Sequence, residues 1–387
     1  MKLRVLFLLS VCIVILSTVY TINLINQDFV LNKEDEYEDT MTIWMTTPGL
    51  LSSMNHFEEE SKIKVNIKQF NNQATLLEEL ALAHTEGNLP DIIEVGSSYG
   101  LDEVVKIGNP YSSEEIGQEL FAPFHEAILE NFYYTDELYG YPLGMELPII
   151  MINRSILNNH FAEDQLITPF SSDDSLETYK LIQDRINHNN QTKPFWLFHF
   201  DEDIPYYWEA YQYTREGSDI SFERYWTNLV KEYQLMPPLD EHMAVTRFSN
   251  MEIGVLITTS SKLQMIQELI GNTFEFDVLP LLDSGELLFI SGNGFVALDN
   301  GGNIRQFYQF VGQEDVQLEI LKNTGWMPTR KTSMSNETFI YQLPMAKYLI
   351  HLVQENNRFH GQAASEGSRN IWKNIQEKAQ EIERNSE

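Results

Sequence analysis

Cysteine is almost absent from this sequence of 387 residues, which contains only Cys12. One thiol cannot form a disulfide within the chain, and it excludes zinc and iron–sulfur sites that need several cysteines. The folded body must therefore be held together by packing. Hydrophobic residues at 43% and aromatic residues at 12% are enough for well-filled cores, and the length suits two ordinary domains.

Positive charge is also scarce. Lysine and arginine number 26 against 57 aspartates and glutamates, which gives a formal net charge of −31. Binding of nucleic acid needs clustered cations opposite the phosphates, so the composition argues against a nucleic-acid partner. The nine histidines show no H-E-x-x-H or other ligand spacing. The sequence therefore predicts neither a metal site nor a cofactor.

No alanine occurs before Ala74, and this bears on the N-terminal segment, residues 1–22. There a short basic start is followed by an uncharged apolar run, which is typical of a signal peptide or a membrane anchor. Ordinary signal cleavage needs small residues in an A-x-A-like arrangement. Simple cleavage is therefore disfavoured.

Two ways of attachment to the membrane remain. The stretch Leu9-Ser-Val-Cys12 approximates a bacterial lipidation motif, although Val11 is bulky and the apolar run continues beyond the cysteine. We favour an uncleaved helix instead, with Lys2 and Arg4 on the cytoplasmic side and the acidic body outside. Residues 23–40 then form a polar, acidic tether.

The body opens with alternating strands and helices. Residues 41–45 and 91–95 predict buried strands, and residues 63–70 alternate between apolar and polar at period two. Between them, Thr47-Pro48 predicts a helix start and Gly87 a helix end. This β-α-β-α-β order implies a parallel sheet, and ligands of such sheets bind beyond the carboxyl ends of the strands.

The middle of the chain predicts a crossing between two lobes. Residues 138–153 carry two prolines and two glycines in strand-like material, which suits an edge or crossing segment. Residues 253–257 and 276–280 predict further strands. Residues 287–298 predict a hairpin-like pair around Gly292-Asn293-Gly294, although these glycines also fit a hinge whose backbone approaches a solute.

Six segments carry a family resemblance. They are Thr42-Ile-Trp44, Phe57-Glu-Glu59 with Ile63-Lys-Val65, Gly87-Asn-Leu-Pro-Asp-Ile-Ile93, Tyr139-Gly-Tyr-Pro-Leu143, Val278-Leu-Pro280 and Thr324-Gly-Trp-Met-Pro-Thr-Arg330. In this order they resemble the sugar-type extracellular solute-binding proteins of ABC importers, the maltose-binding-protein-like family. The chain departs from that family at Thr168-Pro-Phe-Ser171, where the family usually has Pro-x-Thr-Trp.

The resemblance implies an α/β fold of the two-lobed periplasmic-binding-protein type II, with a hinge. It places residues 41–145 and 250–310 in the first lobe, and residues 146–249 and 311–387 in the second. It implies no enzymatic activity. A small solute, most readily a carbohydrate, would be held in a closing cleft outside the cytoplasmic membrane and delivered to the transmembrane subunits of an ABC transporter. A membrane-anchored sensor ectodomain of the same fold is an alternative.

One motif offers an enzymatic alternative. Gly96-Ser-Ser-Tyr-Gly100 fits the G-x-S-x-G pattern between a strand and a helix, where a hydrolase would place Ser98 as its nucleophile. Only two predicted strands precede the strand that leads into it, and no oxyanion segment precedes it. In a binding protein, Ser97 and Ser98 would offer hydroxyls to a solute and Tyr99 a ring, unless they form an ordinary loop.

Further candidates for solute binding are polar groups at strand ends. Glu146 follows the predicted crossing and, as a lone acid among apolar residues, needs a partner if it is buried. Thr259, Ser260 and Ser261 follow a strand and offer hydroxyls, or else form a simple turn. The remaining candidates of this kind are Gly292 and Asn293, with the two interpretations given above.

Aromatic side chains are the last group of candidates, because their rings stack on sugar faces. Most rings between residues 195 and 213 must belong to a core, and we select Trp208 and then Trp196 as stacking platforms. Trp44 stands at a strand end, and Trp326 belongs either to a core or to the cleft. Asp201 lies in an acidic triplet, which is either an acceptor for sugar hydroxyls or an exposed loop.

Overall fold

A computed structural model describes residues 39–96, 99–161, 167–170, 172–189, 193–201, 204–214, 221–237, 243–281, 288–341, 347–355, 359–361 and 363–384. The predictions for the segment 1–22 and for nearly all of the tether 23–40 lie outside the described residues. Only the last two tether residues are described. They begin the first strand, so the body starts two residues earlier than predicted.

Five strands form the first sheet, in the order β2-β1-β3-β12-β6. Their bounds are Asp39–Met45 (β1), Ile63–Gln69 (β2), Ile92–Gly96 (β3), Gly140–Glu146 (β6) and Ser291–Ala297 (β12). Strand β1 is parallel to β2 and to β3, which confirms the predicted arrangement. Strand β12 is antiparallel to both of its neighbours, so β3 and β6 run in the same direction and end at the same edge.

Helices connect and cover these strands. They are α2 (Leu51–Ser61), α3 (Gln73–Glu86), α4 (Leu101–Gly108), α13 (Gly302–Val311) and α14 (Glu314–Thr324). The local sequence sets the ends of α3: the Asn72 side chain accepts from the Thr75 amide, and Gly87 takes a left-handed φ of 72° as predicted. Leu76 and Leu80 face the core of this first lobe.

Four strands form the second sheet, in the order β10-β7-β9-β8. Their bounds are Pro148–Asn153 (β7), Trp196–Phe200 (β8), Ile253–Thr259 (β9) and Phe276–Pro280 (β10). The helices of this second lobe are α7 (Arg154–Leu157), α8 (Asp173–Asn189), α9 (Ile204–Thr214), α10 (Phe222–Thr227), the π-helix η4 (Asn228–Glu232), α11 (Ala244–Ser249) and α12 (Leu263–Ile270).

The boundaries drawn from the sequence need two corrections. Residues 250–281 were assigned to the first lobe, but β9 and β10 lie in the second sheet because both pair with β7. Conversely, α14 was assigned to the second lobe, yet its buried Val316, Ile320 and Leu321 pack in the first core. The predicted crossing is confirmed: β6 is an edge strand of the first sheet, and β7 begins two residues after it in the second.

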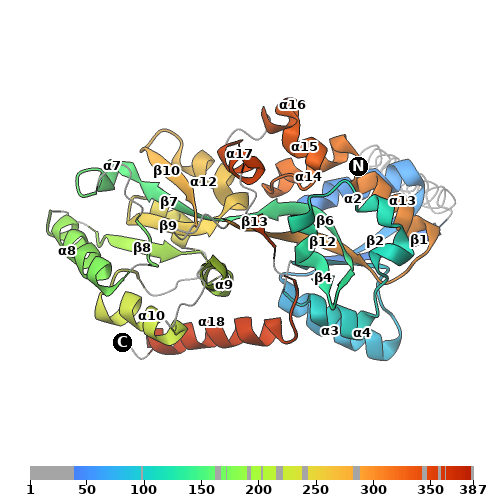
Figure 1. The fold of residues 1–387 in the computed structure, drawn as a ribbon, viewed down its shortest axis with the longest axis horizontal. Helices are drawn as coiled ribbons and strands as arrows, with labels where there is room; N and C mark the ends of the chain where they lie inside the picture. The colour runs from blue at the N-terminus through green and yellow to red at the C-terminus, as the bar shows by residue number, and fades with distance from the viewer. Residues whose placement is uncertain are drawn as a thin grey trace, which may run out of the picture.

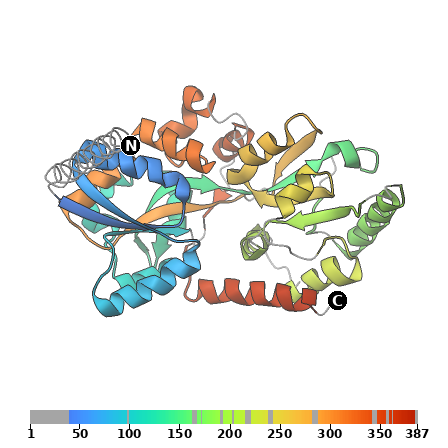
Figure 2. The same cartoon turned by 180° about the vertical axis from the view of Figure 1, so that it is seen from behind.

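The C-terminal part covers both lobes on opposite sides. Helices α15 (Lys331–Ser335), α16 (Glu337–Tyr341) and α17 (Lys347–Glu355) lie on one side, while α18 (Ser368–Arg384) runs along the other, from beside α3 and α4 to α10 (Figures 1 and 2). A third hydrophobic cluster joins α15–α17 to the crossing through residues such as Leu147, Met327 and Leu349.

Short elements complete the fold. They are η1 (Pro48–Leu50), α5 (Ser113–Ile116), η2 (Gln118–Leu120), α6 (Glu126–Leu129), η3 (Glu130–Phe132), η5 (Ser260–Lys262), and the paired strands β4 (Tyr133–Tyr134) with β5 (Glu137–Leu138) and β11 (Leu288–Phe289) with β13 (Phe359–His360).

Candidate functional site

The carboxyl ends of the two sheets meet where the chain crosses between the lobes. Strand β6 ends at Glu146, a single residue, Leu147, follows, and β7 begins. The amide of Ser260 donates to the Leu147 carbonyl at 2.8 Å, and the Leu147 amide donates to the Ser260 hydroxyl at 3.0 Å. Ser260, predicted as a solute ligand, is thus buried and fixes the crossing to the end of β9.

Glu146 lies partly buried at this meeting point and has hydrogen-bond partners there. The Ser261 hydroxyl donates to its carboxylate at 2.7 Å, and the hydroxyls of Ser261 and Thr259 are 2.6 Å apart. Burial raises the pKa of Glu146, while hydrogen bonds from Ser261 and Thr259 and the charge of Lys262 act in the opposite direction. Three of the predicted site residues therefore form one hydrogen-bonded group.

A second polar group follows from the end of β8. Asp201 is buried; its carboxylate accepts from the Thr258 hydroxyl at 3.0 Å and forms an ion pair with Lys262. The buried charge is therefore compensated within the lobe. The sequence-based interpretation of Asp201 as part of an exposed acidic loop is therefore wrong.

Close to the crossing, the Ser291 hydroxyl donates to the Tyr206 hydroxyl at 2.8 Å, which joins β12 to α9.

The first lobe contributes a network that the sequence analysis missed. Glu94 is fully buried in β3, and its carboxylate accepts from the amides of Thr46 and Thr47 at 2.7 and 3.0 Å. It also accepts from the Thr47 hydroxyl at 2.5 Å and from the Asn293 side-chain amide at 2.7 Å. Thr47 makes no side-chain cap on the helix that follows. Glu94 is an isolated acid in an otherwise apolar strand, and this is the sequence signal by which it could have been found.

Gly292 and Asn293 lie inside strand β12, so the predicted hairpin turn is wrong. Residues 291–294 pair with β6 on one side, and Asn293 and Gly294 pair with β3 on the other. A Cβ at Gly292 would stand 2.1 Å from the Gly144 carbonyl oxygen, so this close approach between strands requires glycine. Asn293 is brought to the same edge as Thr47 and Glu94.

The selected tryptophans do not gather at this edge. Trp208 is buried in the second core, with its ring 5.1 Å from the Tyr225 ring. Trp196 begins β8 and so lies at the opposite end of that strand from the site. Trp44 packs on Phe70 and beneath Lys68, and Trp326 is buried against Gly144. Their surroundings give Trp44, Trp208 and Trp326 a place in packing.

Tyr99 does lie at the edge, beyond the end of β3. Its ring is 5.0 Å from the Trp372 ring of α18, and burial raises the pKa of its hydroxyl, opposed by the neighbouring Arg369. Ser97 and Ser98 lie outside the described residues, and with them the nucleophile of the hydrolase alternative.

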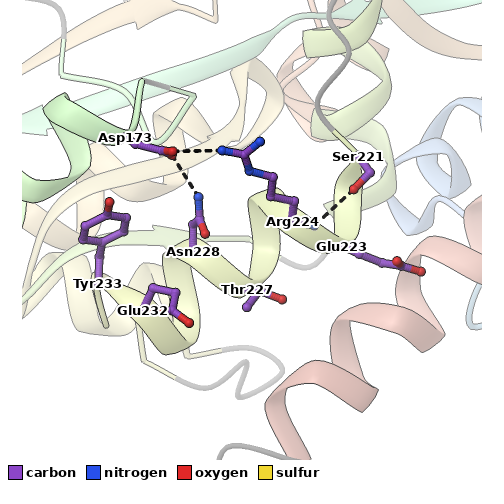
Figure 3. Close-up of a pocket in the computed structure, with 8 residues that line it drawn as sticks. All are labelled: Asp173, Ser221, Glu223, Arg224, Thr227, Asn228, Glu232 and Tyr233. Carbon is purple, nitrogen blue, oxygen red and sulfur yellow. Dashed lines mark hydrogen bonds and ion pairs between the residues drawn. The ribbon is translucent and has the colours of Figure 1, made fainter.

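An open recess of about 570 Å³ lies elsewhere, on the surface of the second lobe (Figure 3). Asp173 of α8 accepts there from Arg224 and Asn228, each at 3.0 Å, which ties α8 to α10 and η4. No residue predicted for the site lines it. Its polar groups have a structural role in joining helices.

Two features are absent from the described residues. Among those residues, no group of three or more histidines, cysteines or acids is placed to hold a metal ion. In the same part of the chain, no helix is both long enough and apolar enough to cross a bilayer.

The fold is that of the two-lobed solute-binding proteins. An ABC transporter solute-binding protein from Thermotoga lettingae, bound with α-D-tagatose, is 16% identical with a TM-score of 0.68, over 90% of this chain and 95% of that one. A maltose/maltodextrin-binding domain from Bdellovibrio bacteriovorus, bound to maltotriose, is 14% identical with a TM-score of 0.67, over 90% and 95%. The lacto-N-biose-binding protein of Bifidobacterium longum is 13% identical with a TM-score of 0.68, over 90% and 92%.

The chain belongs to the family of bacterial extracellular solute-binding proteins, whose model matches residues 53–342. Comparison with curated protein sequences gave no match. The family is one of binding proteins and not of enzymes, which removes the hydrolase interpretation of Ser98. Its description also agrees with the extracytoplasmic location expected from the sequence.

Proposed function

We propose that this protein binds a carbohydrate where the carboxyl ends of its two sheets meet. The observation that carries the proposal is the convergence of polar side chains from both lobes on the crossing at Leu147. Thr47 and Asn293 come from the first lobe, and Thr259 and Ser261 come from the second. Hydroxyl and amide groups of this kind exchange hydrogen bonds with sugar hydroxyls.

The charges at the edge favour a neutral solute over an anionic one. Among the described residues, three carboxyl groups lie there, those of Glu94, Glu146 and Asp201. The nearby cations are already paired, Lys262 with Asp201 and Arg369 with Glu78 and Glu103. An anionic solute would be repelled by this excess of negative charge. A polyhydroxylated neutral molecule meets no such cost. The solved structures with tagatose, maltotriose and lacto-N-biose support the same class.

Among the residues predicted from the sequence, we assign solute contact to Tyr99, Glu146, Thr259, Ser261 and Asn293. Calorimetric titration with mono- and oligosaccharides tests the class, with sugar phosphates and amino acids as matched alternatives. We expect heat of binding with at least one neutral sugar and none with its phosphate. Binding of a different solute class without binding of any sugar would contradict the proposal.

We further propose that the bound solute is handed to the transmembrane subunits of an ABC transporter after closure of the lobes. The protein would stay near them through an uncleaved helix within residues 1–22 or, as the alternative, a lipid on Cys12. Intact mass of the protein extracted from membranes distinguishes these. We expect the mass of the unprocessed chain, changed in Cys12→Ser only by the exchange of sulfur for oxygen. A product that has lost residues 1–11 and gained acyl chains, and that Cys12→Ser abolishes, would establish lipidation.

Transport itself separates this role from that of a sensor. Uptake of labelled sugar should require both the protein and the permease subunits. Uptake that is unaffected by loss of the protein, while sugar still binds to it, would favour the sensor ectodomain.

A further inference from the structure

Helix α18 is built into the second lobe along most of its length. Ala379 is 0% exposed within the second core. The Trp226 indole nitrogen donates to Glu383 at 3.2 Å, and Lys378 pairs with Glu223 of α10 at 2.5 Å. Because these contacts combine apolar burial with hydrogen bonds, α18 must move as part of the second lobe.

The first turn of the same helix is held by the first lobe through polar contacts. The buried Asp102 of α4 accepts from the Gly367 amide at 3.0 Å and from the Ser368 hydroxyl at 3.4 Å. The Arg369 guanidinium pairs with Glu103 at 3.0 Å and with Glu78 at 3.2 Å. These ion pairs are partly solvated, since the Arg369 and Glu78 side chains are 22% and 70% exposed.

Trp372 lies between the lobes on this helix. Its ring is 5.0 Å from Tyr99 of the first lobe and 6.4 Å from Tyr206 of the second. Its indole nitrogen donates to Glu209 of α9 at 2.8 Å. Tyr99 in turn hydrogen-bonds Arg369. The Trp372 side chain thus contacts Tyr99 of the first lobe and both Tyr206 and Glu209 of the second.

We infer that α18 is a latch between the lobes. The latch consists of Gly367, Ser368, Arg369 and Trp372, and it holds the lobes at the spacing seen in this structure. Its grip on the first lobe is the weaker one, because surface ion pairs and single ring contacts stabilise far less than a buried core. When the lobes separate, α18 stays with the second lobe and the contacts with Asp102, Glu103 and Tyr99 break.

The chain preceding the helix allows this motion. Ala364 is fixed to the first lobe, where its amide donates to the Tyr133 carbonyl at 3.1 Å. Gly367 follows with a φ of 78°, a conformation that glycine adopts without strain. Rotation of the backbone between Ala364 and Gly367 lets α18 move away from the first lobe. Ala364 then stays bound to that lobe, and α18 itself stays folded.

The inference rests on the two-lobed fold and not on the identity of the solute, so it is tested without one. Spin labels at Glu86→Cys on α3 and Leu181→Cys on α8, both exposed positions, report the lobe separation in full-length protein carrying Cys12→Ser. Arg369→Glu should raise the ratio of separated to latched molecules roughly fivefold or more, through lost pairing and new repulsion. An unchanged distance distribution would overturn the latch.

Two further variants keep the outcome interpretable. Adding Glu103→Arg to Arg369→Glu reverses the ion pair and should return the distribution toward the parent; failure to do so would also count against the latch. Lys373→Ala removes a neighbouring side chain that is 69% exposed and should leave the distances unchanged. Thermal melting of each variant shows that the lobes themselves remain folded.

Discussion

Ser261 donates a hydrogen bond to Glu146 across 2.7 Å, although Glu146 ends a strand of the first sheet and Ser261 follows a strand of the second. The bond therefore joins the first lobe to the second at the point where the chain crosses between them. Ser260, its neighbour, bonds the crossing itself through Leu147. Ser261 thus bonds a side chain of the candidate site, whereas Ser260 bonds the backbone of the crossing.

Ser261→Ala should lower solute affinity about tenfold with little change in stability, because it removes a partly exposed hydroxyl that bonds a charged group. Ser260→Ala is the matched control. It leaves the buried Leu147 amide without its acceptor and should lower the free energy of unfolding by about 1–3 kcal/mol. Calorimetric titration and denaturant unfolding measure the two effects. Equal changes in solute affinity and in the free energy of unfolding for the two variants would contradict these separate roles.

Glu146→Gln should change how stability depends on pH. Burial raises the pKa of Glu146, so its proton stabilises the folded state at low pH, and that contribution is lost as the pH rises through the raised pKa. The variant cannot titrate there. Relative to the parent it should become more stable as the pH is increased from 4.5, the ordinary pKa of a glutamate, through the raised pKa of the parent's Glu146.

Denaturant unfolding across this pH range measures the difference for Glu146→Gln. Glu86→Gln, at an exposed position of α3, is the surface control. A gap between Glu146→Gln and the parent that stays constant with pH would show that burial does not set the pKa of this carboxyl.

Gly144→Ala should destabilise the first lobe. A Cβ there would stand 2.5 Å from the Trp326 Cβ and 2.6 Å from its ring. Trp326 is buried and cannot retreat, so we expect a loss of about 1–3 kcal/mol in the free energy of unfolding. Gly302→Ala, where a Cβ meets nothing within 4 Å, should be neutral or slightly stabilising. Thermal and denaturant unfolding compare the two, and equal stabilities would argue against the close packing.

Trp208→Ala distinguishes a core residue from a solute platform. Removing this buried ring should cost about 3–5 kcal/mol of stability. Solute affinity of the folded fraction should stay within about twofold, because Trp208 packs on Tyr225 away from the meeting edges. The milder Trp208→Phe provides a folded sample for titration if the alanine variant is too unstable. A loss of solute affinity without the expected loss of stability would show instead that Trp208 is a stacking platform for the solute.

Local patterns were enough to predict the first lobe's beginning and the crossing. Period-two alternation, the cap at Gly87 and the prolines near Leu147 are all features of short segments, and the structure contains the strands, helix end and edge strand that they predict. The glycines around Asn293 illustrate the limit. Glycine serves a turn and a close strand contact equally well, and here the deciding neighbour is Gly144, about 150 residues away in sequence.

The same limit applies to the aromatic candidates and to the site as a whole. Nothing local distinguishes Trp208, which is packed between helices, from a ring that faces a solute. Trp372 was not selected, because its contacts with Tyr99 and Tyr206 depend on how α18 lies across two lobes. Glu94 was within reach of the reasoning that selected Glu146, since both are single acids among apolar neighbours.

The position of β12 has a consequence for the order of assembly during synthesis. This strand stands between β3 and β6, but the chain makes it only after every strand of the second sheet, which is complete at Pro280. Until Ala297 has been made, the first sheet remains in two pieces, each with an unpaired inner edge, and such edges invite pairing with other chains. The sheet that begins first is therefore the one that finishes last.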